Sequence, residues 1–213
     1  MKSFDWEFER SRGQYLRSLR INPNNSTTLF YYSLLLSSLN ELDTAISTAR
    51  AAVSIDPLNP SVQENYIRIL GFQRKFDEAY DYYITNQVAL GQAEALPQIL
   101  IELGDTIGGL QKTYEMIDTI PNFPEHLKLN IAEAIERKDG SMGFQVLVEM
   151  LQDKPQVLIA AGRYDEAFEI LFEDVKLHDG GLTYLLVDPA FDPVRNDPRF
   201  KELVKQVGLD KYQ

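Results

Sequence analysis

The feature that most constrains this chain of 213 residues is an internal repeat with a period of 34 residues. Residues 19–23 read LRINP and residues 53–57 read VSIDP, so the two prolines lie 34 positions apart. A second pair has the same offset, with LDTAI at residues 42–46 and FDEAY at residues 76–80. Two independent matches at one spacing indicate repeated supersecondary units that stack on one another. The sequence therefore predicts a repeat array.

The units of this array are predicted to be helical. Apolar side chains recur at steps of three and four residues, which places them on one helical face: Leu29, Tyr32, Leu36 and Leu39. Turn-forming clusters at residues 23–26 and 57–60 each precede such a pattern. No stretch of strand length alternates with a period of two. We therefore expect an all-α fold.

The unit over residues 26–59 resembles the tetratricopeptide repeat (TPR), a hairpin of two helices. The positions that carry the resemblance are Leu29, Tyr32, Ser33, Leu36, Ala45, Ala49, Ala52 and Pro57. The next unit begins at Pro60 and keeps the pattern at Tyr66, Leu70, Ala79 and Tyr83. It departs from the family at Ile67, where a small residue is usual, and at Asn86, where alanine is usual. The resemblance covers residues 5–90 and 155–180 and implies a TPR-like superhelix of helical hairpins.

The array opens on half a unit, because residues 6–21 have the pattern of a second helix without its first. A half hairpin is expected to leave an apolar face uncovered, with Phe8, Tyr15 and Leu19 as its candidates. A missing hairpin partner from a longer protein would cover that face, and so would a second copy of the chain in a homodimer.

The repeat pattern is lost after about residue 90. The hairpin signal returns at residues 163–168, which is 88 positions after residues 75–80 and not a multiple of 34. Glycine and proline divide the intervening chain into four predicted helices at residues 92–103, 108–119, 124–138 and 142–151. We therefore divide the chain into regular hairpins over residues 1–96 and degenerate TPR-like helices over residues 97–213.

The end of the chain contains three Asp-Pro steps, at residues 188–189, 192–193 and 197–198. Aspartate accepts amide hydrogen bonds at a helix start, and proline suits the first helical position because it has no amide hydrogen. The third step predicts a capping helix over residues 198–207 that ends at Gly208. Its apolar side chains are Phe200, Leu203, Val204 and Val207, and Phe191 before it is expected to be a buried anchor.

The two ends of the chain also carry a narrower resemblance. Residues 4–6, residues 22–24 and the Asp-Pro-rich tail are similar to the C-terminal TPR region of bacterial signalling proteins. In those proteins the region follows a winged-helix DNA-binding domain, as in ToxR-like transcriptional regulators, or a class III adenylate cyclase domain. The resemblance implies a sensory or interaction module of a larger regulator.

Composition excludes several functions for the chain. The net charge is −11, so no basic footprint supports direct nucleic acid binding. The absence of cysteine excludes disulfides, thiolate zinc sites, iron–sulfur ligation and cysteine nucleophiles. No apolar run is long enough for a membrane span, and the first residues lack the apolar core of a signal peptide. The sequence is compatible with a location in the cytoplasm or in the periplasm.

No constellation of residues points to catalysis. The two histidines, His126 and His178, are 52 positions apart and do not form a helical pair for a metal. Asp188 and Asp192 each precede a proline, so turn capping explains them better than calcium binding. We therefore expect no catalytic residue, cofactor or metal and no enzymatic activity. The alternatives are a small-molecule sensor built from the irregular helices of residues 97–155 and an enzyme without a recognisable motif.

The TPR resemblance implies a partner-binding groove, because the first helices of such hairpins line a concave surface for peptides or helices. Phe30, Tyr31 and Leu34 from one unit would face this groove with three residues from the next unit, Glu64, Asn65 and Arg68. Aromatic and aliphatic side chains of this kind are typical interface anchors, so we expect a protein or peptide partner. The alternative is that other helices of the chain cover the same surface.

Overall fold

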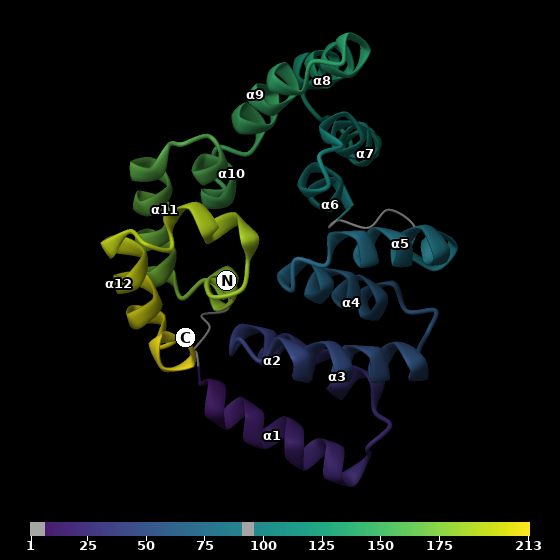
Figure 1. Ribbon diagram of the computed structural model, residues 1–213, viewed down its shortest axis with the longest axis vertical. Helices are drawn as coiled ribbons and strands as arrows, with labels where there is room; N and C mark the ends of the chain where they lie inside the picture. Colours follow the sequence, from purple (N-terminus) through teal and green to yellow (C-terminus); the bar gives the residue numbers. More distant parts are fainter. Residues whose placement is uncertain (1–6, 91–95) are drawn as a thin grey trace.

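The computed structural model describes residues 7–90 and 96–213, with the side chains of 7–86 and 99–213. Figure 1 shows the helices arranged as a curved array that returns toward its own start. The α-helices are α1 (Phe8–Ile21), α2 (Ser26–Ser38), α3 (Leu42–Ile55), α4 (Pro60–Phe72), α5 (Phe76–Leu90), α6 (Leu96–Glu102), α7 (Thr106–Asp118), α8 (Glu125–Arg137), α9 (Gly140–Met150), α10 (Pro155–Ala160), α11 (Tyr164–Leu177) and α12 (Pro198–Val207). Three 3-10 helices near the end are η1 (Gly180–Tyr184), η2 (Pro189–Val194) and η3 (Asp210–Tyr212). The described residues contain no strand, and none of their helices combines the length and apolarity that a membrane crossing requires.

Local turn chemistry builds the hairpins. The side chains of Asn25 and Asn59, 34 positions apart, cap the starts of α2 and α4 by accepting backbone amide hydrogen bonds. The turns that join α2 to α3 and α4 to α5 each contain one left-handed residue, Asn40 with φ 59° and Arg74 with φ 60°. The period predicted from the sequence therefore recurs in the backbone, and the TPR-like all-α fold is confirmed.

Short side chains allow these helices to pack closely. Ala45, Ala49 and Ala79 are fully buried, as expected for the second helices of the first two hairpins. In the second half, Gly143 of α9 likewise allows close packing, because a Cβ at this position would lie only 2.1 Å from the Leu110 side chain of α7. The interior of the array thus depends on small residues at the helix crossings.

The second half contains the helices that the sequence predicted, with shifts of a few residues at their ends. The predictions at 108–119, 124–138 and 142–151 correspond to α7, α8 and α9. The prediction at 92–103 corresponds to α6 from Leu96 onward, and residues 92–95 lie outside the described part of the chain.

The Asp-Pro-rich tail folds as a run of capped short helices. The carboxylates of Asp179, Asp188 and Asp197 each accept a backbone amide hydrogen bond at the start of η1, η2 and α12. The capping helix begins at Pro198 and ends at Val207 as predicted. Its predicted apolar side chains and Phe191 are all buried.

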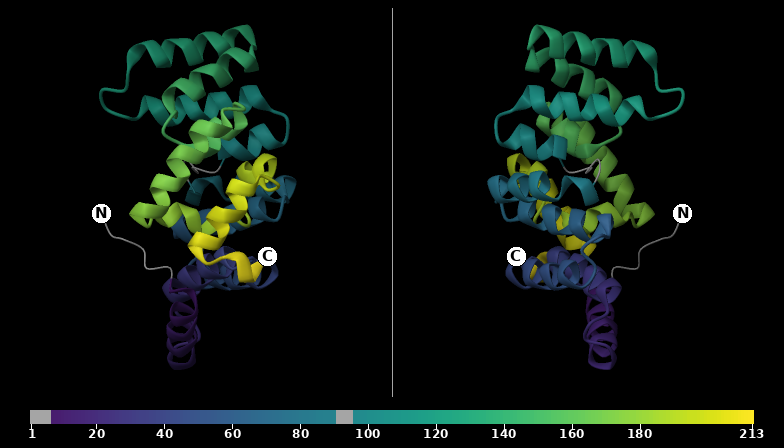
Figure 2. Two further views of the ribbon diagram at one scale, coloured as in Figure 1. Left: turned by 90° about the vertical axis from the view of Figure 1, so that its left-hand side faces the viewer. Right: turned by 90° about the vertical axis from the view of Figure 1, so that its right-hand side faces the viewer.

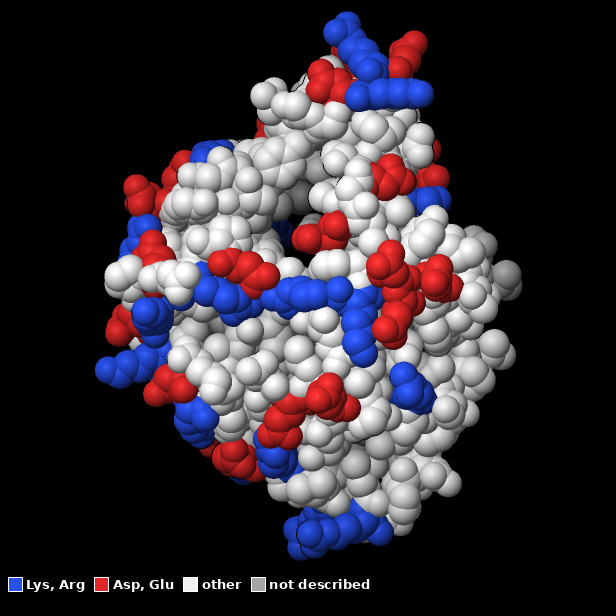
Figure 3. All heavy atoms as spheres, in the orientation of Figure 1, with Lys and Arg blue, Asp and Glu red and all other residues white. Residues whose placement is uncertain are grey.

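This tail closes the array onto its own beginning. In both figures the C-terminal segment lies beside the first hairpin, with the α8–α9 hairpin at the far end (Figures 1 and 2). The largest apolar cluster joins Phe8, Leu35 and Leu39 to buried side chains from residues 158–209. Arg74 crosses the same seam, donating to the Val187 carbonyl at 2.7 Å and pairing with Asp192 at 2.7 Å. Figure 3 shows a band of basic and acidic side chains across this face, below a central opening.

The closure corrects one expectation about the half unit. Phe8 is only 7% exposed, because Tyr212 packs edge-on against it with ring centroids 6.3 Å apart. Tyr15 packs against Tyr32, and Leu19 packs against the cluster under α2. The prediction of an uncovered apolar face at Phe8, Tyr15 and Leu19 is therefore wrong, because the end of the chain and α2 cover it. The homodimer stays a prediction, and it is no longer supported by an uncovered apolar face on α1.

Candidate partner-binding groove

The six predicted groove residues occupy two neighbouring helices, α2 and α4, which are in contact. The repeat period places them in rows across the two helices: Phe30 opposite Glu64, Tyr31 opposite Asn65, and Leu34 opposite Arg68. The next row in the same register is Ser38 and Phe72. The sequence thus brings residues 34 positions apart onto one surface, as stacked hairpins require.

Two aromatic side chains on α2 differ in exposure. Phe30 is half-buried and packs against the apolar cluster of Leu29, Ala52 and Val62. Tyr31 is 49% exposed, and its ring meets that of Phe30 edge-on at 4.9 Å between centroids. Phe30 therefore supports Tyr31 in an exposed position, and Leu34 lies half-buried one turn further along.

Asn65 lies beneath this surface and does not face it, contrary to the prediction from the sequence. It is only 2% exposed, and its amide nitrogen donates a hydrogen bond to the Ser33 hydroxyl at 2.7 Å. That hydroxyl in turn donates to the Phe30 carbonyl at 2.7 Å. Asn65 therefore links α4 to α2, and its buried amide oxygen has no hydrogen-bond partner among the described residues.

The protein's own C-terminal segment covers one end of this candidate surface. The Tyr184 ring of η1 packs on Phe72 with centroids 5.4 Å apart, and Ser38 is buried. Burial raises the pKa of the Tyr184 hydroxyl, and the nearby positive charge of Arg68 opposes that rise. The rows of Phe30 and Leu34 remain partly exposed, while the row of Ser38 and Phe72 is filled.

Sequence reasoning missed Phe72 and Tyr184 as parts of this surface. Phe72 could have been found, because it is 34 positions after Ser38 in the same register. Tyr184 carried no such signal, since only the closure of the array brings it to the groove.

The residues considered for metal chemistry have other contacts. His126 is exposed and lies 3.8 Å from Glu149, and His178 is the left-handed residue that ends α11. Asp188 caps η2 as the turn interpretation predicted, and Asp192 accepts hydrogen bonds from Arg74 and Arg195. Among the described residues, no cluster of three or more His, Asp or Glu could hold a metal ion.

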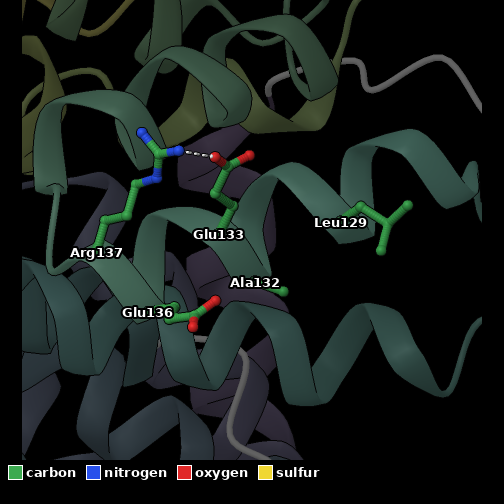
Figure 4. A pocket seen from close by; sticks show the side chains of 5 residues that line it. All are labelled: Leu129, Ala132, Glu133, Glu136 and Arg137. Atoms are coloured by element: carbon green, nitrogen blue, oxygen red, sulfur yellow. Dashed lines mark ion pairs between the residues drawn. The ribbon is translucent and has the colours of Figure 1, made fainter.

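A hollow in the region suggested for a small-molecule sensor lies along α8. It is lined by Leu129, Ala132, Glu133, Glu136 and Arg137. Figure 4 shows all of them along one helix, with an ion pair of 2.6 Å between Glu133 and Arg137. A ligand site normally draws polar groups from several facing elements, so a surface from one helix gives the sensor alternative no support.

Comparison with known proteins agrees with the repeat pattern. The family model of the tetratricopeptide repeat matches residues 14–47, which run from α1 through α2 into α3. No curated protein matches the chain. One solved structure that resembles it is "Crystal structure of YrrB: a TPR protein with an unusual peptide-binding site", with 16% identity over 91% of this chain and 90% of that chain and a TM-score of 0.41. The matched repeat thus begins within α1, includes α2 and ends within α3, and further helical hairpins follow it along the chain.

Proposed function

We propose that this chain is a non-enzymatic module that binds a protein or peptide partner on the open part of the groove between α2 and α4. The observation that carries the proposal is Tyr31, an exposed aromatic side chain held by Phe30 beside half-buried Leu34. Rigid aromatic side chains supply contact area at low entropic cost, which makes them frequent anchors of interfaces.

We further propose that the module serves a larger bacterial regulator. The sequence at the two ends, which resembles the TPR region of ToxR-like regulators and class III cyclases, supports this assignment. In this proposal the regular hairpins of residues 1–96 contact the partner. Residues 97–213 hold those hairpins in a closed array.

Selection of random dodecapeptides displayed on phage tests the groove. We expect the wild-type protein to enrich a family of peptides that the double variant Tyr31→Ala, Leu34→Ala does not bind. The matched control is Leu58→Ala, which removes a side chain that is 79% exposed on the loop before α4. Equal binding of the enriched peptides to the double variant would contradict the proposal, provided that all three proteins show the same helical circular dichroism.

A further inference from the structure

We propose that Arg68 makes the groove selective for a partner segment with an internal Asp or Glu beside an apolar side chain. This inference rests on the proposed function of the groove and names the chemistry of its partner. Arg68 lies on α4 in the same row as Leu34, at the edge of the part that the C-terminal segment leaves open.

Arg68 differs from every other half-buried cation in the described part of the chain. The others each form an ion pair: Arg12 with Glu41, Lys112 with Glu115, Lys128 with Asp118, Arg163 with Glu166, Arg195 with Asp192, and Arg199 with Asp165 and Asp197. Arg68 forms no ion pair with any described residue. Removing a guanidinium partly from water without a counter-charge is unfavourable. An anionic group of a partner could therefore form an ion pair with Arg68, which no described residue of the protein forms.

Aromatic side chains lie on one side of Arg68, and the half-buried carboxylate of Glu64 lies one turn before it on α4. Phe72, one turn further along α4, packs on Tyr184, whose ionisation responds to the charge of Arg68. An acidic side chain at Arg68 would thus lie among rings, where partial exclusion of water strengthens a charge-assisted hydrogen bond.

The occupant is an acidic side chain rather than a C-terminal carboxylate. Of the six candidate residues only Arg68 is a cation, whereas Phe30 and Leu34 are apolar and Asn65 is buried. One guanidinium is matched by one carboxylate, which it can hold through two parallel hydrogen bonds. Because the protein has a net charge of −11, we expect the partner segment to be neutral or basic outside that one acid.

The same phage library, selected on wild-type protein and on Arg68→Gln, tests the inference. We expect Asp or Glu next to an apolar residue in the peptides from the wild type and no such enrichment from the variant. Replacing that acid by its amide in a synthetic peptide should weaken binding to the wild type by about five- to tenfold and leave binding to Arg68→Gln unchanged. Arg68→Lys keeps the charge but cannot make two parallel hydrogen bonds, so it should restore only part of the preference. Lys205→Gln, which removes an exposed charge on α12, should behave as the wild type.

Three results would overturn the inference, and they have different meanings. Equal acid content in peptides from wild type and Arg68→Gln would show that Arg68 selects no anion, while the groove itself still binds. Loss of binding when the peptide C-terminus is amidated would assign the anion to a terminal carboxylate. Failure of the wild type to enrich any peptide would contradict the proposed function, and this inference with it.

Discussion

At the scale of single residues, side-chain size and charge at a few buried positions control how closely the elements meet. Ala45 and Ala79 recur at the same place in successive hairpins, and both are fully buried. At the closing seam, the carboxylates of Asp188 and Asp192 lie near two arginines, Arg74 and Arg195. The two carboxylates nevertheless have pKa values that shift in opposite directions, which makes the seam sensitive to pH.

Replacing Ala45 by leucine should overpack the α3 crossing. The expected loss is about 1–3 kcal/mol of unfolding free energy, measured by urea denaturation, because the buried site has no room for three additional carbons. Ala51→Leu is the matched control, since Ala51 is an exposed residue of the same helix. A variant at residue 45 that is as stable as the control would refute the close crossing.

Asp188→Asn should stabilise the protein at pH 7 by a fraction of a kcal/mol. Burial raises the pKa of Asp188, so the folded state holds this proton more firmly than the unfolded state, and the charged form weakens folding at neutral pH. The asparagine oxygen can still cap the Ala190 amide. Because the penalty disappears as pH falls through the folded pKa, the gain over wild type should shrink toward acid, as followed by thermal melting.

Asp192→Asn provides the opposite control at the same seam. Burial alone would raise the pKa of Asp192, but hydrogen bonds from Arg195 and Arg74 outweigh it and lower the pKa below its ordinary value. Its stabilising contribution is therefore present above about pH 4 and lost as pH falls through the folded pKa. This variant should be less stable than wild type at pH 7 and converge with it in acid. Parallel pH profiles for the two variants would contradict the assignment.

At the scale of elements, α12 shows how local signals and packing combine. Asp197 caps its start, Pro198 occupies the first position, and Gly208 ends it in the left-handed conformation with φ 78°. Its apolar face then packs on α11 and on residues of the first hairpin. The helix therefore covers the last hairpin and also joins it to the beginning of the array.

Phe200→Ala should cost about 3–5 kcal/mol, the range for truncating a buried phenylalanine. The ring packs with Phe191 at 5.8 Å between centroids, and its loss should increase amide hydrogen exchange in α11. Lys201→Ala, at the exposed neighbouring position, is the control and should leave exchange unchanged. Full protection of α11 in the Phe200 variant, or in a chain truncated after Asp197, would mean that α12 is an appendage.

At the scale of the whole molecule, apolar contacts and a few polar ones close the array. The apolar cluster spans residues 8–209, whereas Arg74 bridges to Val187 and Asp192, and Tyr212 donates to Glu9 at 2.6 Å. Buried apolar area contributes more to such a seam than exposed ion pairs do. The closure is therefore expected to persist when a single polar contact is removed.

Arg74→Ala tests whether apolar burial, and not the polar contacts, holds the seam closed. It should cost about 1–3 kcal/mol because the Val187 carbonyl loses its side-chain donor, while the Asp192 carboxylate keeps only Arg195. Hydrogen exchange should rise in residues 180–194, while the radius of gyration from small-angle X-ray scattering stays the same. Lys75→Ala, an exposed neighbour, is the control. A larger radius of gyration in the Arg74 variant would show that polar contacts hold the seam.

The sequence by itself determined the local part of this protein. The period of 34 residues, the cap at Asp197 and the helix over 198–207 all depend on contacts within one hairpin or one turn. Such contacts join residues close in sequence, so propensity and spacing suffice to predict them. The same holds for the position of the six candidate residues on α2 and α4, but not for the burial of Asn65.

Only the tertiary structure decided which side chains are buried by segments that are distant in the sequence. The burial of Phe8 by Tyr212, the filling of the groove at Phe72 by Tyr184, and the contact of Arg74 with Val187 join residues more than 100 positions apart. These contacts depend on the curvature that accumulates over every hairpin between them, including the degenerate ones. Because small differences in each crossing add up along the array, no local pattern specifies where the chain returns. The exposure of Tyr31, and the lack of an ion pair between Arg68 and any described residue, depend on where that return stops.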